Sequence, residues 1–171
     1  MTLVKVRSRG INLADDFAFT GTISGAGGGK VGQVVQTSTS TALSSTSDSY
    51  VDLSGFTFNF TPSATNSNVL INCSISTGMD NHSSYETASV LKLVRDSTDL
   101  KEITLVSNYG NWMAGNYSFI FYDTAISTTS QVTYKFQAKR INGGQTFKIN
   151  SGYSAANSYQ TSEMTAIEIL A

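Results

Sequence analysis

The chain has 171 residues, a formal net charge of −1 and only 13% charged residues. That length suits one domain with a substantial core, and so weak a charge excludes the basic surface that holds nucleic acid or an anionic membrane. No apolar run approaches the ~20 residues of a transmembrane helix, so we expect no membrane insertion. The N-terminus also lacks the pattern of a secretion signal, which predicts synthesis in a cytoplasm.

Composition favours strands over helices. Ser, Thr and Asn make up about a third of the chain, beside nine Phe, eight Tyr and a single Pro. Ser, Asn and Gly favour turns, whereas Thr and the aromatic residues favour half-buried pleated surfaces. The single cysteine, Cys73, rules out an internal disulfide. Because Cys73 alternates with Val69, Ile71 and Ile75, we expect it to be a small buried hydrophobe.

Residues 1–31 differ from the rest and predict an extended anchoring arm ahead of a domain at 32–171. The arm has a sparse basic cluster that includes Lys5, scattered apolar residues and a glycine run. The run lacks the spacing of a phosphate-binding loop, so we interpret it as a flexible hinge. The expected hinge residues are Gly25, Gly27, Gly28 and Gly29. The expected anchoring residues are Val4, Val6, Arg7, Arg9, Ile11, Leu13, Phe17, Phe19 and Ile23.

Alternation of apolar residues with period 2 recurs through the body, as in sheets that bury one face. The alternation places Phe56, Phe58 and Phe60 together on one face, and Pro62 opens a polar turn after them. Another polar turn is expected at residues 96–99. The predicted strands of this kind are residues 33–37, 56–60, 69–75, 89–95, 102–106, 132–138 and 163–170.

Two further segments carry distinct expectations. Tyr117–Tyr122 is almost entirely aromatic or apolar, which suggests burial on both faces. Asn142-Gly143-Gly144 leads into a short run with Phe147 and Ile149, and Asn-Gly between two alternating runs predicts a β-hairpin.

Eight to ten short strands without helical periodicity predict an all-β fold. A jelly-roll β-sandwich fits this spacing better than a barrel with a ligand cavity. In several strands apolar residues also occur on the opposite parity, which suggests a second buried face used for subunit packing. These residues are Leu91, Leu93, Val106, Tyr122 and Ile169.

The sequence offers little for chemistry. One His and one Cys cannot form a zinc site within one chain; only in a trimer could three copies of His82 or Asp80 meet on an axis and bind an ion. No Gly-x-Ser-x-Gly elbow surrounds a serine, and no pair of carboxylates can be proposed. We therefore expect no enzyme activity, no catalytic or metal-binding residues and no cofactor.

The most recognition-like segment is residues 108–117, where the only Trp lies among Asn, Gly and Tyr. Rigid aromatic groups mixed with adaptable polar ones are typical of binding surfaces, and residues 153–159 have a similar character. The candidate receptor or glycan contacts are Tyr109, Asn111, Trp112, Asn116, Tyr153 and Tyr159. The structural alternative, which we favour, is that Trp112 and Tyr109 pack on a neighbouring subunit or cap the sandwich.

Residues 9–36, RGINLADDFAFTGTISGAGGGKVGQVVQ, resemble the entry segments of many phage virion proteins. The body is similar to fibre-head and decoration-type domains of marine phages and cyanophages. That similarity rests on residues 44–53 (SSTSDSYVDL), 58–63 (FNFTPS) and 164–170 (MTAIEIL). The resemblance implies a homotrimeric jelly roll of the complement/tumour-necrosis-factor type, assembled in the cytoplasm of a host bacterium and displayed on the virion. It implies no catalytic residue.

Three functions follow as hypotheses. The first is a short trimeric fibre or spike whose arm binds another virion protein (tail, portal-proximal or capsid) and whose head contacts a host-surface glycan. The second is a capsid decoration protein that stabilises the shell. The third, from another class, is a free carbohydrate-binding module.

Overall fold

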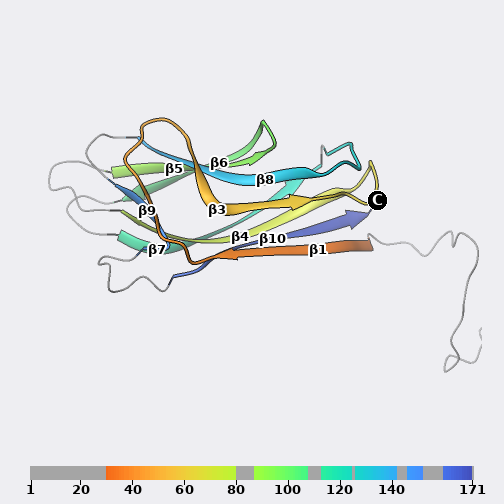
Figure 1. Cartoon of the computed structure of the whole chain (residues 1–171), viewed down its shortest axis with the longest axis horizontal. Coiled ribbons are helices and arrows are strands. Elements are labelled where there is room, and N and C mark those ends of the chain that lie inside the picture. Colours follow the sequence, from red (N-terminus) through yellow and green to blue (C-terminus); the bar gives the residue numbers. More distant parts are fainter. Residues whose placement is uncertain are drawn as a thin grey trace, which may run out of the picture.

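The computed structural model describes residues 30–79, 87–107, 113–124, 126–141, 146–151 and 160–170, and Figure 1 colours these parts of the chain. The predicted arm, apart from Lys30 and Val31, and the predicted hinge lie outside the described residues. The boundary after residue 31 therefore stays a prediction.

The described residues form ten strands and no helix, which confirms the all-β prediction. All seven predicted alternating segments lie in strands, and each of these strands is longer than the predicted segment. The strands are β1 (Lys30–Thr39), β2 (Leu43–Ser45), β3 (Val51–Phe60), β4 (Asn68–Met79), β5 (Thr87–Arg95), β6 (Thr98–Ser107), β7 (Met113–Asp123), β8 (Val132–Arg140), β9 (Phe147–Ile149) and β10 (Ser162–Leu170).

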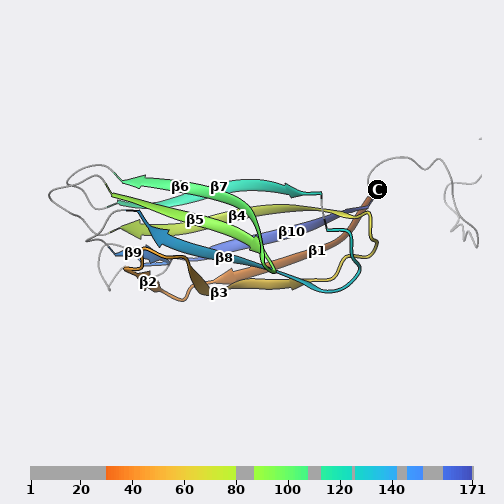
Figure 2. The ribbon, with the colours of Figure 1, turned by 90° about the horizontal axis from the view of Figure 1, so that it is seen from above.

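Two antiparallel sheets face each other (Figures 1 and 2). In the first, sheet A, β1 pairs with β10, β10 with β4 and β4 with β7. The short strands β9 and β2 extend this sheet beyond the end of β10. In the second, sheet B, the order is β3-β8-β5-β6. The eight long strands, four in each sheet, thus form a jelly roll.

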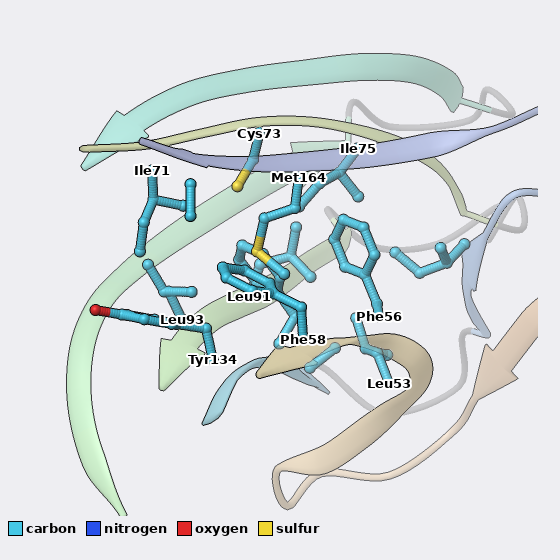
Figure 3. Close-up of a cluster of buried hydrophobic side chains, with 14 of the residues drawn as sticks. Leu53, Phe56, Phe58, Ile71, Cys73, Ile75, Leu91, Leu93, Tyr134 and Met164 are labelled. Atoms are coloured by element: carbon cyan, nitrogen blue, oxygen red, sulfur yellow. The ribbon is translucent and has the colours of Figure 1, made fainter. Parts of the chain in front are cut away.

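The core fills the space between the sheets. Every second side chain of the predicted strands points inward: Phe56, Phe58 and Phe60 in β3 are all buried, and so is the face of β8 that carries Tyr134 and Phe136. Phe56 stacks on Phe136 with ring centroids 5.0 Å apart, and Phe58 stacks on Tyr134 at 5.3 Å. Figure 3 shows Phe56, Phe58 and Tyr134 on the side of the core opposite Ile71, Ile75 and Met164 of sheet A. Each such buried ring contributes about 1.5–3 kcal/mol to folding.

Cys73 is a buried hydrophobe, as predicted. It lies in β4 between Ile71 and Ile75 and points toward Met164 and the core (Figure 3). Burial raises the pKa of its thiol to about 12. The thiol is therefore protonated and unreactive at neutral pH.

The hairpin predicted at Asn142-Gly143-Gly144 is wrong. The strands on either side belong to different sheets, since β8 pairs with β3 and β5 whereas β9 pairs with β4 and β2. The chain crosses from one layer to the other here. The three-residue β9 buries Phe147 and Ile149 in the inter-sheet core instead of pairing with β8.

The expectation that Tyr117–Tyr122 is buried on both faces is also wrong. Within β7, Ile120 is 67% exposed and Tyr122 is 47% exposed, whereas Tyr117, Phe119 and Phe121 are half-buried against the core. β7 lies at the edge of its sheet with one face on the core and the other outside. Its apolar outer residues therefore need a different explanation.

Candidate functional site

The outer face of sheet B carries the charged row, which we define as Asp52, Gln137, Lys92 and Glu102. These four residues are in register across β3, β8, β5 and β6. Gln137 Nε2 donates to Asp52 Oδ1 at 2.7 Å, and the Lys92 ammonium lies 3.0 Å from Asp99 Oδ2. Each charged group of this row thus has a polar partner on the same face.

Tyr50 contacts the charged row on the outer face of sheet B. Its hydroxyl donates to Glu102, and the ammonium nitrogens of Lys92 and Lys139 lie 3.8 and 4.5 Å from its ring centroid. Burial and the hydrogen bond to Glu102 raise the pKa of Tyr50 to about 12. The hydrogen bond from Gln137, together with Lys135 at 2.9 Å, lowers the pKa of Asp52. The charged groups of this row are therefore held by polar or aromatic partners on the same face.

The outer face of sheet A carries the apolar row, which we define as Val34, Ile167, Leu70 and Tyr122. These residues are in register across β1, β10, β4 and β7. Their neighbours along each strand point inward, so these four point away from the core. Val34 is 59% exposed, and Ile167 and Leu70 are half-buried beside it.

The apolar character is confined to one half of sheet A. Ile120 lies beside the row in β7, and Val31 pairs with Ile169 at the end where β1 begins and β10 ends. The register row farther along is polar: it consists of Ser38, Glu163, Ser74 and Ser118. Large exposed hydrophobic residues gathered on one side of a small domain mark an interaction surface.

A buried carboxylate fixes the chain where it enters β1. Glu168 is fully buried and accepts hydrogen bonds from the Ser63 amide at 2.6 Å and from Gln33 Nε2 at 3.0 Å. A Cβ on Gly32 would lie 2.7 Å from Glu168 Oε2, so a larger residue here would displace the Glu168 side chain. Burial raises the pKa of Glu168, but the hydrogen bonds prevail and the pKa lies below its ordinary value.

A second buried ionic group joins the two sheets at the same end. Arg95 Nη1 of β5 contacts both carboxylate oxygens of Asp123 of β7, at 2.7 and 2.6 Å. The Tyr134 hydroxyl donates to Asp123 Oδ2 at 2.8 Å. Burial and the adjacent Asp123 carboxylate raise the pKa of Tyr134. Because Asp123 is only 2% exposed, this cluster is a structural link rather than a solvent-facing site.

A cleft of about 330 Å³ opens at the opposite end of the sandwich. Buried Leu53, Phe147 and Ile149 form its apolar part, and three serines supply polar groups. An irregular register in β3, where Gly55 adopts φ +78°, bends that strand beside the cleft. The lining residues are Leu43, Ser44, Ser45, Val51, Asp52, Leu53, Ser54, Phe147 and Ile149.

Of the six predicted receptor contacts, only Asn116 lies among the described residues. It is exposed in β7 and shares the outer face with Ser118 and Ile120. The other predicted contacts, Tyr109, Asn111, Trp112, Tyr153 and Tyr159, lie outside the described residues, as do Asp80 and His82. Leu91 and Leu93, expected on a second buried face, belong to the core of the single chain.

Four apolar residues on the outer face of sheet A were not predicted from the sequence: Val34, Leu70, Ile120 and Ile167. The available signal was the presence of apolar residues on both parities of one strand, as in Ala166, Ile167 and Ile169 of β10. That signal identified Tyr122 and Ile169, which do lie on this face. It does not show whether the odd-numbered or the even-numbered residues of a strand face the core.

Within the described ranges, no group of three or more His, Cys, Asp or Glu side chains is arranged to hold a metal ion. Over the same ranges, no helix long and apolar enough to span a membrane was found.

Comparison with known proteins gives a likeness in structure only. No protein-family model matches the sequence, and no curated protein matches it. Among solved structures, the chain is similar to a chain of the T13 viral particle of infectious bursal disease virus, with 9% identity and a TM-score of 0.42. That match covers 93% of this chain and 41% of the other. The VP2 subviral particle of the same virus matches with 11% identity and a TM-score of 0.40, covering 84% and 38%. The chain thus spans less than half of the length of these proteins.

Proposed function

We propose that this chain is a non-enzymatic structural component of a bacteriophage virion, a short homotrimeric fibre or spike. Its N-terminal arm binds another virion protein, and its β-sandwich is displayed as the head. Assembly takes place in the cytoplasm of the host bacterium. The resemblance of residues 9–36 to phage entry segments, together with the jelly roll, supports this reading.

The observation that carries the proposal is the difference between the two outer faces. The apolar row exposes hydrophobic side chains with no charge among them, whereas the charged row is covered by its own ion pairs. Burying the apolar row against other copies removes apolar area from water at about 25 cal/mol per Å². Depletion of charge is also typical of the buried centre of subunit interfaces.

The mass of the full chain in solution tests the proposal. Sedimentation equilibrium is expected to give three times the 18.3 kDa of one chain. A monomer at micromolar concentration contradicts the trimer. Labelled particles imaged by electron microscopy then separate a fibre from a decoration protein, because label spread over the shell supports decoration and label at one vertex or the tail supports a fibre.

The cleft favours a second candidate function, the binding of a saccharide. An apolar floor of Leu53, Phe147 and Ile149 beside three serines suits the two sides of a pyranose ring. Titration with methyl glycosides of glucose, galactose and N-acetylglucosamine, followed by NMR, tests it. Saturable shifts that Ser54→Trp abolishes support the site, and shifts unchanged by Ser54→Trp, or no saturable shift, contradict it.

A further inference from the structure

The four long edge strands of the sandwich, β1, β3, β6 and β7, differ in how they are protected against pairing with another strand. β1 has a register shift between Val31 and Val34, and β3 has one between Asp52 and Thr57. β6 carries three charged residues at its exposed edge, Asp99, Lys101 and Glu102. Bulges and charges are the usual devices that keep an edge from adding a strand.

β7 has none of these devices. It pairs with β4 in unbroken register from Met113 to Asp123, and no charged residue or proline precedes Asp123. Among the described residues its only strand partner is β4. The ten residues from Met113 to Tyr122 form a regular, uncharged edge, which is a ready template for a further strand.

The inward side of β7 also leaves apolar surface uncovered. Tyr117, Phe119 and Phe121 pack against the core but stay half-buried, unlike the fully buried Ile71 and Ile75 of neighbouring β4. A strand added beside β7 would place its own inward side chains against these three rings. The fitting occupant is an extended segment with one apolar and one polar side.

One segment of this chain has that pattern. Between residues 11 and 23 the large apolar side chains all fall on odd positions, and the even positions hold only small or polar residues. The apolar set is Ile11, Leu13, Phe17, Phe19 and Ile23. This alternation, interrupted by Asp15 and Gly21 on the odd side, predicts a strand with one largely apolar face.

We propose that residues 11–23 of a second copy of this chain add to the free edge of β7 as an antiparallel strand. This inference rests on the proposed function, in that it requires the chain to assemble. It leaves the first ten residues, with their basic cluster, for contact with another virion protein.

Geometry assigns the segment to a second copy rather than to the same chain. Every strand pair in both sheets is antiparallel, and parallel pairing is less stable per residue. An antiparallel segment would place Ile23 near Met113, whereas Lys30 lies at the Asp123 end of the sheet. The eleven residues of β7 span about 34 Å, but the seven steps from Ile23 to Lys30 reach at most ~25 Å.

Cysteine cross-linking between two full-length versions of the chain tests the inference. One version carries Ala18→Cys and the other Ser118→Cys, both on the side of the strand that faces away from the core. Native Cys73 does not compete, because it is buried. The two versions, one labelled with ¹⁵N, are refolded together and oxidised, and disulfide-linked pairs are counted by mass spectrometry.

The matched control is Thr104→Cys, an exposed position on the edge strand β6 of the other sheet. Pairs of Ala18→Cys with Ser118→Cys, or with Ile120→Cys one step along, are expected to exceed pairs with Thr104→Cys about tenfold, because directly opposite strand residues meet the distance needed for a disulfide. Equal yields with Thr104→Cys contradict the inference. A further version carries both Ala18→Cys and Ser118→Cys. If its disulfide forms only within single chains, the inference is also contradicted.

Sedimentation of the unmodified chain distinguishes a failure of this inference from a failure of the proposed function. An oligomer that gives no such cross-link overturns this inference and leaves the proposed function standing. A monomer overturns both.

Discussion

The two outer faces of the sandwich are built on the same pattern and reach opposite results. Each carries a row of four residues in register across four strands. On sheet B the row is Asp52–Gln137–Lys92–Glu102, and its partners lie on the same face. On sheet A the row is Val34–Ile167–Leu70–Tyr122, with Ile120 beside it.

This difference between the two outer faces supports the proposal that sheet A, rather than sheet B, is the side used in assembly. On sheet B, the charged groups of the row already have polar partners on the same face, so this row needs no further partner for its charges. A sheet that exposes aliphatic and aromatic side chains at one end gains free energy when that end is covered. One face is therefore suited to solvent and the other to assembly.

The largest effect is expected where charge lies between the sheets rather than on either face. Asp123→Ala should lower the free energy of unfolding by about 3–5 kcal/mol, because it removes the buried carboxylate that both Arg95 Nη1 and the Tyr134 hydroxyl contact. Urea denaturation measures this. The control is Asp48→Ala, which removes the exposed partner of Arg140 and should lower the free energy of unfolding by less than ~1 kcal/mol. Equal losses in the two variants would show that the buried cluster stabilises the fold no more than an exposed ion pair does.

Breaking the apolar surface should act on assembly rather than on folding. Ile120→Arg places a charge at a position where the native side chain is 67% exposed. The free energy of unfolding of the dissociated variant should therefore stay within ~0.5 kcal/mol of that of the unmodified chain. Its dissociation constant should rise at least about tenfold by sedimentation, since a buried unpaired charge costs well over ~1.4 kcal/mol. Thr104→Arg on sheet B is the control. If both variants dissociate equally, the two faces do not differ in the way we describe.

Glu168→Gln tests the support of sheet A at the start of β1. At pH 7 the variant should be about 1–2 kcal/mol less stable, because its amide group donates where Ser63 and Gln33 also donate. The pKa of Glu168 is lowered from 4.5 in the folded protein. Its contribution is therefore present above pH 4.5 and is lost as pH falls through the lower folded value. Denaturation curves of the two proteins should converge in acid; a constant gap from pH 7 to pH 3 would contradict this.

The smallest effect is expected on sheet B. Lys135→Ala removes the ion pair with Asp52, whose side chain is 58% exposed. We expect a loss of at most ~1 kcal/mol, and less in 1 M salt, since exposed pairs are weak and screened. Urea midpoints at low and high salt measure it. A loss above that of Glu168→Gln would mean that the charged row does more than keep this face soluble.

The sequence predicted strands better than it predicted their partners. The alternation that places Phe56, Phe58 and Phe60 on one face is local, so the buried faces of β3, β4 and β8 could be read directly. The pairing of β9 with β4 depends on residues some 70 positions apart, and the local Asn-Gly signal therefore predicted the wrong partner. The three-residue β2 is too short to show any alternation and was missed.

The candidate surface was predictable only in part. Tyr122 and Ile169 were predicted because they are apolar residues at positions of opposite parity to the other apolar residues of their strands. The apolar row, however, appears only when four separate strands are brought into register. The charged row depends on register in the same way. A list of apolar residues along one strand cannot distinguish the side of an edge strand that faces the core from the side that faces a partner.

Hydrogen exchange of the full chain tests the central claim most directly, because it reads both sheets in one experiment. At concentrations where the chain is assembled, amides from Gly115 to Tyr122 in β7 should exchange at least about tenfold more slowly than those of edge strand β6, and dilution should remove the difference. Exchange along β7 as fast as along β6 at every concentration would contradict the account.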